Sequence, residues 1–456
     1  MDNKSARVRQ SRLWGTALLA LLAPLTFSGN AVSMQSSDEP AAGQGAAVSF
    51  TRDVAPILQQ NCQICHRPGS VGPMSLLTYD EAKSYAPMIK AQVAAREMPP
   101  YHLDTQVGIQ AIKGDWRLSD QQIRTIVGWV DSGMAMGDVA DMPPPVEWPE
   151  AQRWQLEDQL GKPDHVIESR PYDVPAEGGD IWWRPRVETG LNTNRLIRAF
   201  EIRPSFPAGR QVVHHAIPRL MTPNEDGEWV RTAMLSEYAM GKVGEIIPED
   251  AARMLPVNSL IEWDVHYYPM GYAVEDDQLE LGLWLYPEGY EPEYIQDLDM
   301  YRLQGDIALA PGGTAMTQGF HRWDHPVRID SFQPHGHVHL HAKSMRAIYP
   351  DGSEELLSMV TNFNARWHHS YIYEDGVAPL LPTGTVLVIT AWYDNTENNP
   401  LNPDPQIWYA RGARTTDEMS HAWLAVTHLD EAGYEELAAE RKAKSEVAAE
   451  DSDDGS

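Results

Sequence analysis

The sequence predicts a multidomain protein in which a small α-helical domain precedes two stacked all-β, jelly-roll-like sandwich domains. Three observations support this fold class. The chain has 456 residues, which is too long for a single hydrophobic core. Apolar residues recur at helical spacing only within residues 48–146. Beyond them, short alternating segments separated by Pro, Gly and Asn are typical of β-sandwiches.

The N-terminal residues have the pattern of a secretory signal peptide. A basic segment, residues 1–12, precedes an apolar run from Leu13 to Leu25, and Gly29-Asn30-Ala31 offers a small-residue cleavage site. The run is shorter than the roughly 20 residues of a membrane-spanning helix. We therefore expect cleavage after residues 1–31, no stable membrane insertion afterwards, and a periplasmic or secreted protein that begins with a Ser-, Ala- and Gly-rich linker at 32–47.

The remaining boundaries follow from changes in pattern along the chain. Met142-Pro143-Pro144-Pro145 ends the helical part and separates it from the β region. We assign the β region to two sandwiches, residues 147–300 and 301–429, followed by an acidic tail, 430–456, expected to be a surface helix. Helices are expected over 51–60, 79–96 and 119–132, and strands over 195–202, 278–286, 344–349 and 385–392.

The net charge and the cysteine content exclude several binding partners and several kinds of cofactor site. The formal net charge of −29 repels nucleic acid and anionic membrane surfaces. Only two cysteines are present, and both lie in one short motif. If that motif binds a cofactor, the chain can form neither a structural disulfide nor a thiolate-ligated copper centre.

The motif Cys62-Gln63-Ile64-Cys65-His66 has the C-x-x-C-H spacing of covalent haem c attachment. The two thiols add to the haem vinyl groups and the adjacent imidazole binds the iron, so all three must reach one macrocycle. A thioredoxin-like redox pair would need a βαβ context, and a zinc site would need a second Cys pair. The sequence has neither, and we predict a cytochrome c-like domain over residues 48–146.

The sixth ligand of the haem iron is predicted to be Met98. A thioether on the far side of the haem would raise its potential, and the prolines of Met98-Pro99-Pro100 can hold the loop rigidly. Met74, Met88 and His102 are the other candidates. A methionine in such a domain can equally be core filler.

Histidines of the β region suggest metal binding. In His335-Gly336-His337-Val338-His339-Leu340-His341 the imidazoles alternate, so on a strand all four would line one face. Borderline metals such as copper and zinc favour imidazole. His214 and His215 are adjacent and would point to opposite sides of a strand, so they can share a metal only where the backbone bends. His165 and His428, by contrast, are interpreted as ordinary polar residues.

The stretch from residue 195 to 428 resembles the type II, ascorbate-dependent copper monooxygenases, which include the peptidylglycine and dopamine hydroxylases. The ligand motifs of that family are matched in order. Its H-H pair matches His214-His215, its apolar-x-H-Y strand matches Val265-His266-Tyr267, its H-x-H pair matches His337 and His339, and its D-E-M motif matches Asp417-Glu418-Met419.

The resemblance implies two stacked eight-stranded sandwiches with one copper each, two per chain, across an open cleft. The copper that stores an electron would be held by His214, His215 and His266. The oxygen-reactive copper would be held by His337, His339 and Met419, where a soft thioether favours Cu(I).

Two features depart from the family pattern. The animal enzymes are rich in disulfides, which this chain cannot form if haem occupies its cysteines. The peptide hydroxylases have an Arg where this chain has His335, and polar and Tyr residues where it has His421 and Trp423. A glycine-extended peptide is therefore not the expected substrate, and His335 or His341 is an alternative to one member of the H-x-H pair.

These observations together predict an exported haem c- and copper-dependent monooxygenase that hydroxylates a C–H bond of a small organic substrate with O2. The haem domain would relay electrons to copper from a periplasmic donor, supplementing or replacing ascorbate. Two alternatives stay open. One is a haem and copper electron-transfer or copper-handling protein without oxygenase turnover, and the other is a carbohydrate- or partner-binding sandwich with structural histidines.

Overall fold

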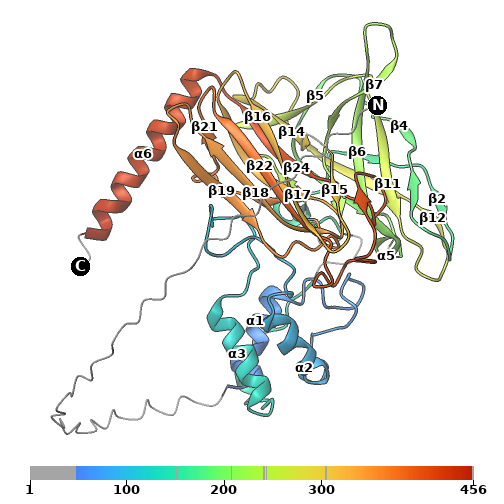
Figure 1. Ribbon diagram of the computed structural model, residues 1–456, viewed down its shortest axis with the longest axis vertical. Helices are drawn as coiled ribbons and strands as arrows, with labels where there is room; N and C mark the ends of the chain where they lie inside the picture. Colours follow the sequence, from blue (N-terminus) through green and yellow to red (C-terminus); the bar gives the residue numbers. More distant parts are fainter. Residues whose placement is uncertain are drawn as a thin grey trace, which may run out of the picture. The chain divides into compact units, whose positions relative to one another are not determined.

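The computed structural model describes residues 48–148, 153–206, 208–239, 242, 244–302 and 306–453. The predicted signal peptide, 1–31, and the predicted linker, 32–47, lie outside the described residues. Val48–Ser456 forms a single unit by its internal contacts, and Figure 1 follows it in sequence order by colour.

Three helices and a helical turn form the N-terminal module: η1 (Phe50–Val54), α1 (Ala55–Asn61), α2 (Tyr79–Ala94) and α3 (Asp120–Asp131) (Figure 1). The helices predicted from apolar spacing are confirmed to within a few residues. α2 and α3 each begin with a capping box, in which a Thr78 or Ser119 side chain accepts from the N3 amide while the Glu81 or Gln122 side chain accepts from the cap amide. Their apolar faces meet in one core that includes Trp129.

The rest of the described chain is mainly β. The largest sheet has ten strands in its described part. Its central path is β1 (His165–Glu168), β13 (Leu279–Leu285), β5 (Arg195–Pro204), β10 (Ala251–Leu255), β14 (Tyr294–Arg302), β24 (His421–His428), β17 (Val327–His335) and β20 (Tyr371–Ile372), with β9 (Glu245–Ile246) on β5 and β21 (Leu380–Leu381) on β17.

Smaller sheets cover the two halves of this long sheet. One contains β3 (Ile181–Trp183), β11 (Leu260–Tyr267), β6 (Val213–Pro223) and β7 (Trp229–Met234), with β4 (Arg186–Glu188) on β11 and β8 (Tyr238–Ala239) on β6. Another contains β16 (Thr314–Arg322), β22 (Val386–Asp394), β18 (Leu340–Ile348) and β19 (Glu354–Val360). Two pairs complete the strands, β2 (Tyr172–Val174) with β12 (Val274–Asp277), and β15 (Ala308–Leu309) with β23 (Tyr409–Ala410).

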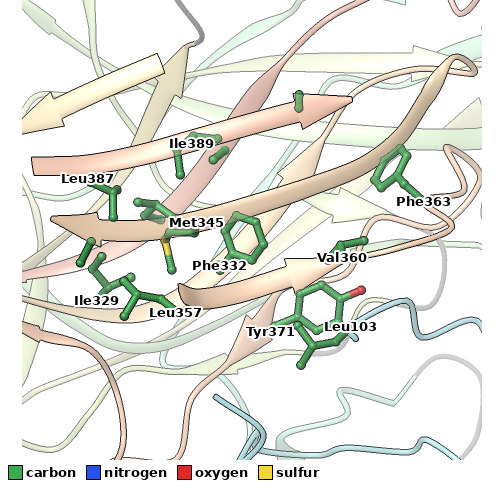
Figure 2. Packing of buried hydrophobic residues seen from close by; sticks show 14 of the residues in the cluster. Leu103, Ile329, Phe332, Met345, Leu357, Val360, Phe363, Tyr371, Leu387 and Ile389 are labelled. Atoms are coloured by element: carbon green, nitrogen blue, oxygen red, sulfur yellow. The ribbon is translucent and has the colours of Figure 1, made fainter. Parts of the chain in front are cut away.

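Two hydrophobic cores divide the β region into two sandwiches. The first core lies between the β5–β13 half of the long sheet and the β6–β11 sheet, around Trp263. The second lies between β17–β24 and β18–β22, around Phe332 and Met345 (Figure 2). The long sheet is continuous because β10 pairs in parallel with β14, so the two sandwiches share one layer.

The chain between α2 and α3 packs on the second sandwich. Leu103 forms a β-bridge with Val360, and Ile112 forms one with Tyr373. Both side chains belong to the second core, and Leu103 lies next to Tyr371 in Figure 2. The helical module is thereby anchored to the β region through buried apolar contacts rather than through a free linker.

The remaining helices are short or C-terminal: α4 (Glu157–Leu160), α5 (Gly209–Val212), the turn η2 (Val139–Asp141) and α6 (Glu431–Asp453). The predicted multidomain β-sandwich architecture is confirmed at this level, as are the four predicted strands, which correspond to β5, β13, β18 and β22. Within the described residues, no helix is both long and apolar enough to cross a membrane.

One local prediction is wrong. His335–His341 is not a single strand, because β17 ends at His335 and β18 begins only at Leu340. The intervening residues turn, and the buried Glu418 carboxylate accepts hydrogen bonds from the amides of His337 and His339. His335 is buried whereas His341 is exposed, so the four imidazoles do not share one face.

Candidate metal centre and adjoining cavity

A β-bulge brings His214, His215 and His266 together. On the paired strands β6 and β11, His266 faces His215, but the next residue, Tyr267, faces Val213. His214 is therefore the extra residue of the bulge, and the local bend lets adjacent side chains turn to one side. One ligand nitrogen from each of the three histidines lies within 4.8 Å of the others. We call this group the three-histidine site.

The surroundings of the three-histidine site fix its rings and keep them neutral. Trp182, opposite His266 on β3, stacks on the His266 ring at 4.4 Å between centroids. An Asp180 carboxylate oxygen lies 3.4 Å from His266 Nε2. Burial lowers the pKa of His214 to about 3 and lowers the pKa values of His215 and His266 as well, with neighbouring imidazoles adding to the effect for His214 and His215. Neutral imidazoles offer the lone pairs that a metal needs.

A second group of possible ligands adjoins the first. Glu237, His335 and His368 are all buried, and one ligand atom from each lies within 4.8 Å of the others. His368 Nδ1 is 3.3 Å from Glu237 Oε1. The Glu237 carboxylate also accepts a hydrogen bond from Gln333, which fixes its orientation.

His368 connects the two groups. Its ring centroid lies 6.0 Å from that of His214, 5.8 Å from that of His215 and 4.9 Å from that of His335. Sequence reasoning missed His368 and Glu237. His368-His369 is an adjacent pair like His214-His215, which was a usable signal, but it lies in a segment without strand periodicity between β19 and β20.

His337 and His339 have different environments. His337 Nδ1 lies 3.1 Å from the Asp417 carbonyl, which suits an Nδ1–H donor and leaves Nε2 for another partner. His339 is fully buried, with Nε2 3.2 Å from Asn402 Oδ1 and Nδ1 3.3 Å from Glu418 Oε1. Both nitrogens of His339 thus face protein groups.

Met419 is held close to these histidines through its neighbour. Glu418 Oε2 accepts from the Met419 amide as well as from the His337 amide. The Asp417-Glu418-Met419 segment is therefore hydrogen-bonded to the turn that carries His337 and His339.

An apolar cavity of about 280 Å³ contains the C-x-x-C-H residues. Cys62 and Cys65 are free thiols on its wall, and burial raises the pKa of Cys62 to about 12. His66 Nδ1 lies 3.3 Å from the Met74 carbonyl, so Nε2 is the nitrogen left for a metal. A Cβ on Gly72 would lie 2.7 Å from the Cys65 carbonyl oxygen and 2.8 Å from His66 Nδ1, so only glycine fits there.

The cavity residues suit a covalently attached haem. Two thiols, an oriented imidazole and apolar walls are the groups that such a cofactor uses. Met98, the predicted sixth ligand, lines the same cavity. Among the other candidates, Met88 is 54% exposed on α2, Met74 packs against the helical core, and His102 lines a neighbouring pocket.

The β region closes this cavity. Trp367 and His369 from the second sandwich line it together with Trp116 from the helical module. His369 follows His368 directly in the sequence. His369 lines the cavity, and His368 lies between the two groups of possible metal ligands. Sequence reasoning did not assign His369 a role.

Comparison with known proteins adds little. No protein-family model matches the chain, and no curated protein matches it. Among solved structures, the chain is similar to the major capsid protein P2 of bacteriophage PM2, with 10% identity and a TM-score of 0.29 over 59% of this chain and 99% of the capsid protein. It is also similar to the PBSX exported protein XepA, with 8% identity and a TM-score of 0.17 over 50% of this chain and 86% of that one. These TM-scores are too low to assign a fold family or a function.

Proposed function

We propose that this chain is an exported haem c- and copper-dependent monooxygenase acting on a C–H bond of a small organic molecule. The observation that carries the proposal is the three-histidine site, in which a bulge turns His214 and His215 toward His266 on the neighbouring strand. The register irregularity gathers two buried imidazoles, His215 and His266, and one half-buried imidazole, His214. It is what an imidazole-ligated metal requires.

Copper is the metal that fits best with the rest of the chain. Both thiols belong to the C-x-x-C-H cavity, so a copper site in the β region would have no thiolate ligand. A redox metal, unlike zinc, makes use of a haem bound in the same folded unit. Copper supplies one-electron chemistry and O2 reactivity when bound, and haem supplies electrons.

The residues around the predicted copper site at His337, His339 and Met419 would each have a role. His337 donates from Nδ1 to the Asp417 carbonyl, which orients Nε2 as a ligand. Glu418 fixes the turn that carries His337 and His339 by accepting both backbone amides. Met419 would add the thioether, and His339 would bind through Nδ1 while Nε2–H donates to Asn402. The Trp423 ring stacks on His335 at 5.1 Å and bounds this region.

The reaction consumes two electrons and two protons for each O2, because one oxygen atom enters the substrate C–H bond and the other leaves as water. The electrons would come from a periplasmic donor, or from ascorbate, through the haem. Because the protein is predicted to be exported, the substrate is expected to be a periplasmic or extracellular molecule.

One observation favours a second candidate, a haem and copper electron-transfer or copper-handling protein. Both ring nitrogens of His339 lie within 3.3 Å of protein oxygen atoms, so the predicted oxygen-reactive site is less open than the three-histidine site. Under this candidate the three-histidine site binds copper, and no substrate is oxidised.

A two-part experiment tests the proposal. Copper content is measured in the wild type and in His214→Ala/His215→Ala, with His165→Ala as a matched strand-histidine control. We expect about two copper ions per chain in the wild type and the control, and about one in the double variant. Reduced holoprotein is then exposed to O2 with a panel of small organic substrates, and products are identified by mass spectrometry.

The outcomes separate the candidates. A hydroxylated product with incorporated ¹⁸O from ¹⁸O2 supports the monooxygenase. Bound copper with no substrate-dependent O2 consumption supports the electron-transfer or copper-handling protein. Absence of copper from wild-type protein loaded with Cu(I) or Cu(II) contradicts both candidates.

A further inference from the structure

His369 has the environment of a metal ligand on the side of the cavity formed by the β region. Its side chain is buried and lines the same cavity as Cys62, Cys65 and His66. Its Nε2 has no hydrogen-bond partner. This buried nitrogen is therefore available to a metal.

We propose that His369 is the second axial ligand of the haem iron, in place of Met98. This assignment rests on the proposed function, because it requires haem to be bound at Cys62 and Cys65. His66, the other proposed axial ligand, has its Nδ1 3.3 Å from the Met74 carbonyl. Such a contact fixes the tautomer and orientation of a ligating imidazole.

The energetics of burial favour His369 over Met98. A buried nitrogen without a hydrogen-bond partner is unfavourable, and coordination to a metal would remove that penalty. A thioether in an apolar cavity carries no comparable penalty, because methionine packs well there without any ligand. Met98 lines the cavity next to Pro99 and Pro100 and is assigned to packing against the haem.

The ring of His369 is held on several sides, as a ligand needs to be. Trp116 meets it edge-on at 5.5 Å between centroids, and Tyr101 lies at 5.9 Å. Trp367, two residues earlier, is nearly parallel to it at 6.5 Å. The helical module and the second sandwich therefore both fix this imidazole.

The assignment also gives a direct route between the two redox centres. His369 is joined by one peptide bond to His368, whose ring lies 5.8 Å from His215 and 6.0 Å from His214. An electron leaving the haem iron could reach the three-histidine site through one ligand, one peptide unit and one short gap between rings.

Spectroscopy of the holoprotein tests the assignment without relying on turnover. Wild-type ferric protein should give a low-spin electron paramagnetic resonance spectrum of the bis-histidine type and lack the near-infrared charge-transfer band of methionine-ligated iron. His369→Ala should become high-spin and return to low-spin when imidazole is added. His369→Met should acquire the methionine band and a higher potential, since a His/Met pair raises it.

Met98→Leu is the matched control, because it removes the thioether and keeps the volume. Its spectrum and potential should equal those of the wild type. A methionine band in the wild type that disappears in Met98→Leu overturns the assignment while leaving the proposed function intact. Wild-type protein that lacks covalent haem after export overturns the haem part of the proposed function and this assignment with it.

Discussion

Burial has the largest effect on the protonation of the imidazoles in the three-histidine site. The imidazoles of the three-histidine site have lowered pKa values because desolvation disfavours their charged form. The same effect acts in the opposite direction on a carboxyl group. Asp277 on β12 is fully buried, and burial raises its pKa to about 6 although the nearby Tyr267 hydroxyl opposes the shift.

Asp277→Asn should stabilise the protein at pH 8 and have little effect at pH 4. The folded pKa exceeds the unfolded value of about 3.9, so the buried carboxylate lowers stability as pH rises toward about 6 and the penalty then stays constant. The expected gain in unfolding free energy at pH 8 is about 3 kcal/mol, measured by urea titration at both pH values. The exposed neighbour Asp276→Asn is the control and should change little. An equal change in unfolding free energy at pH 4 and pH 8 would rule out this explanation.

At the level of elements, the sequence predicts whether a segment is a helix or a strand better than it predicts the local backbone geometry. The spacing of Ile126 and Trp129 on one face of α3, after Ser119 as N-cap, could be read directly because caps and periodicity are local properties. The strands β5, β13, β18 and β22 were predictable for the same reason.

Features that depend on pairing partners could not be predicted. The sequence indicates that His214 and His215 can share a metal only if the backbone bends between them. Whether it bends depends on the register of β6 against β11, which the sequence does not give. The alternation at residues 335–341 was misleading because Glu418, distant in sequence, takes the amides of His337 and His339. Between β17 and β18, hydrogen bonds from these two amides to the Glu418 side chain replace the hydrogen bonds that a strand would form.

The capping box of α3 offers a test at this scale. Ser119→Ala removes the acceptor of the Gln122 amide and should destabilise the first turn of α3 by about 1 kcal/mol. Hydrogen exchange at the amides of that turn should become faster by roughly a factor of five, the equivalent of that energy. Ser84→Ala is a suitable comparison, because the Ser84 hydroxyl only bonds back to Asp80 within α2. Unchanged exchange in Ser119→Ala would show that the cap is not needed.

On the scale of the whole molecule, a buried polar network joins the two sandwiches where they share a sheet. Arg328 on β17 pairs with Asp250, just before β10, through two hydrogen bonds, and with Asp330 on its own strand. Arg253 on β10 bonds Gln296 on β14, which in turn bonds Asp330. These neighbouring carboxylates raise the pKa of Arg328 despite the opposing effect of burial, so the guanidinium stays charged.

Asp250→Ala should therefore destabilise the entire β region. Removing one partner leaves the Arg328 charge buried with less compensation, and losses of about 3 kcal/mol are typical when a buried pair is broken. Urea unfolding measures the loss, and scanning calorimetry shows whether the two sandwiches then melt separately. Asp375→Ala breaks the exposed pair with Lys113 and should cost less than about 1 kcal/mol. Equal effects of both substitutions would argue against a joining role for the network.

The wall that Trp367 and His369 give to the Cys62–Cys65 cavity has a consequence for the timing of maturation. The two cysteines emerge from synthesis and export long before the residues that enclose them. Once the second sandwich has packed, burial raises the pKa values of both thiols and leaves almost no reactive thiolate at neutral pH. We therefore expect covalent attachment of the proposed haem to precede closure of the cavity. In a chain that folded in the opposite order, the enclosed thiols would no longer react with haem.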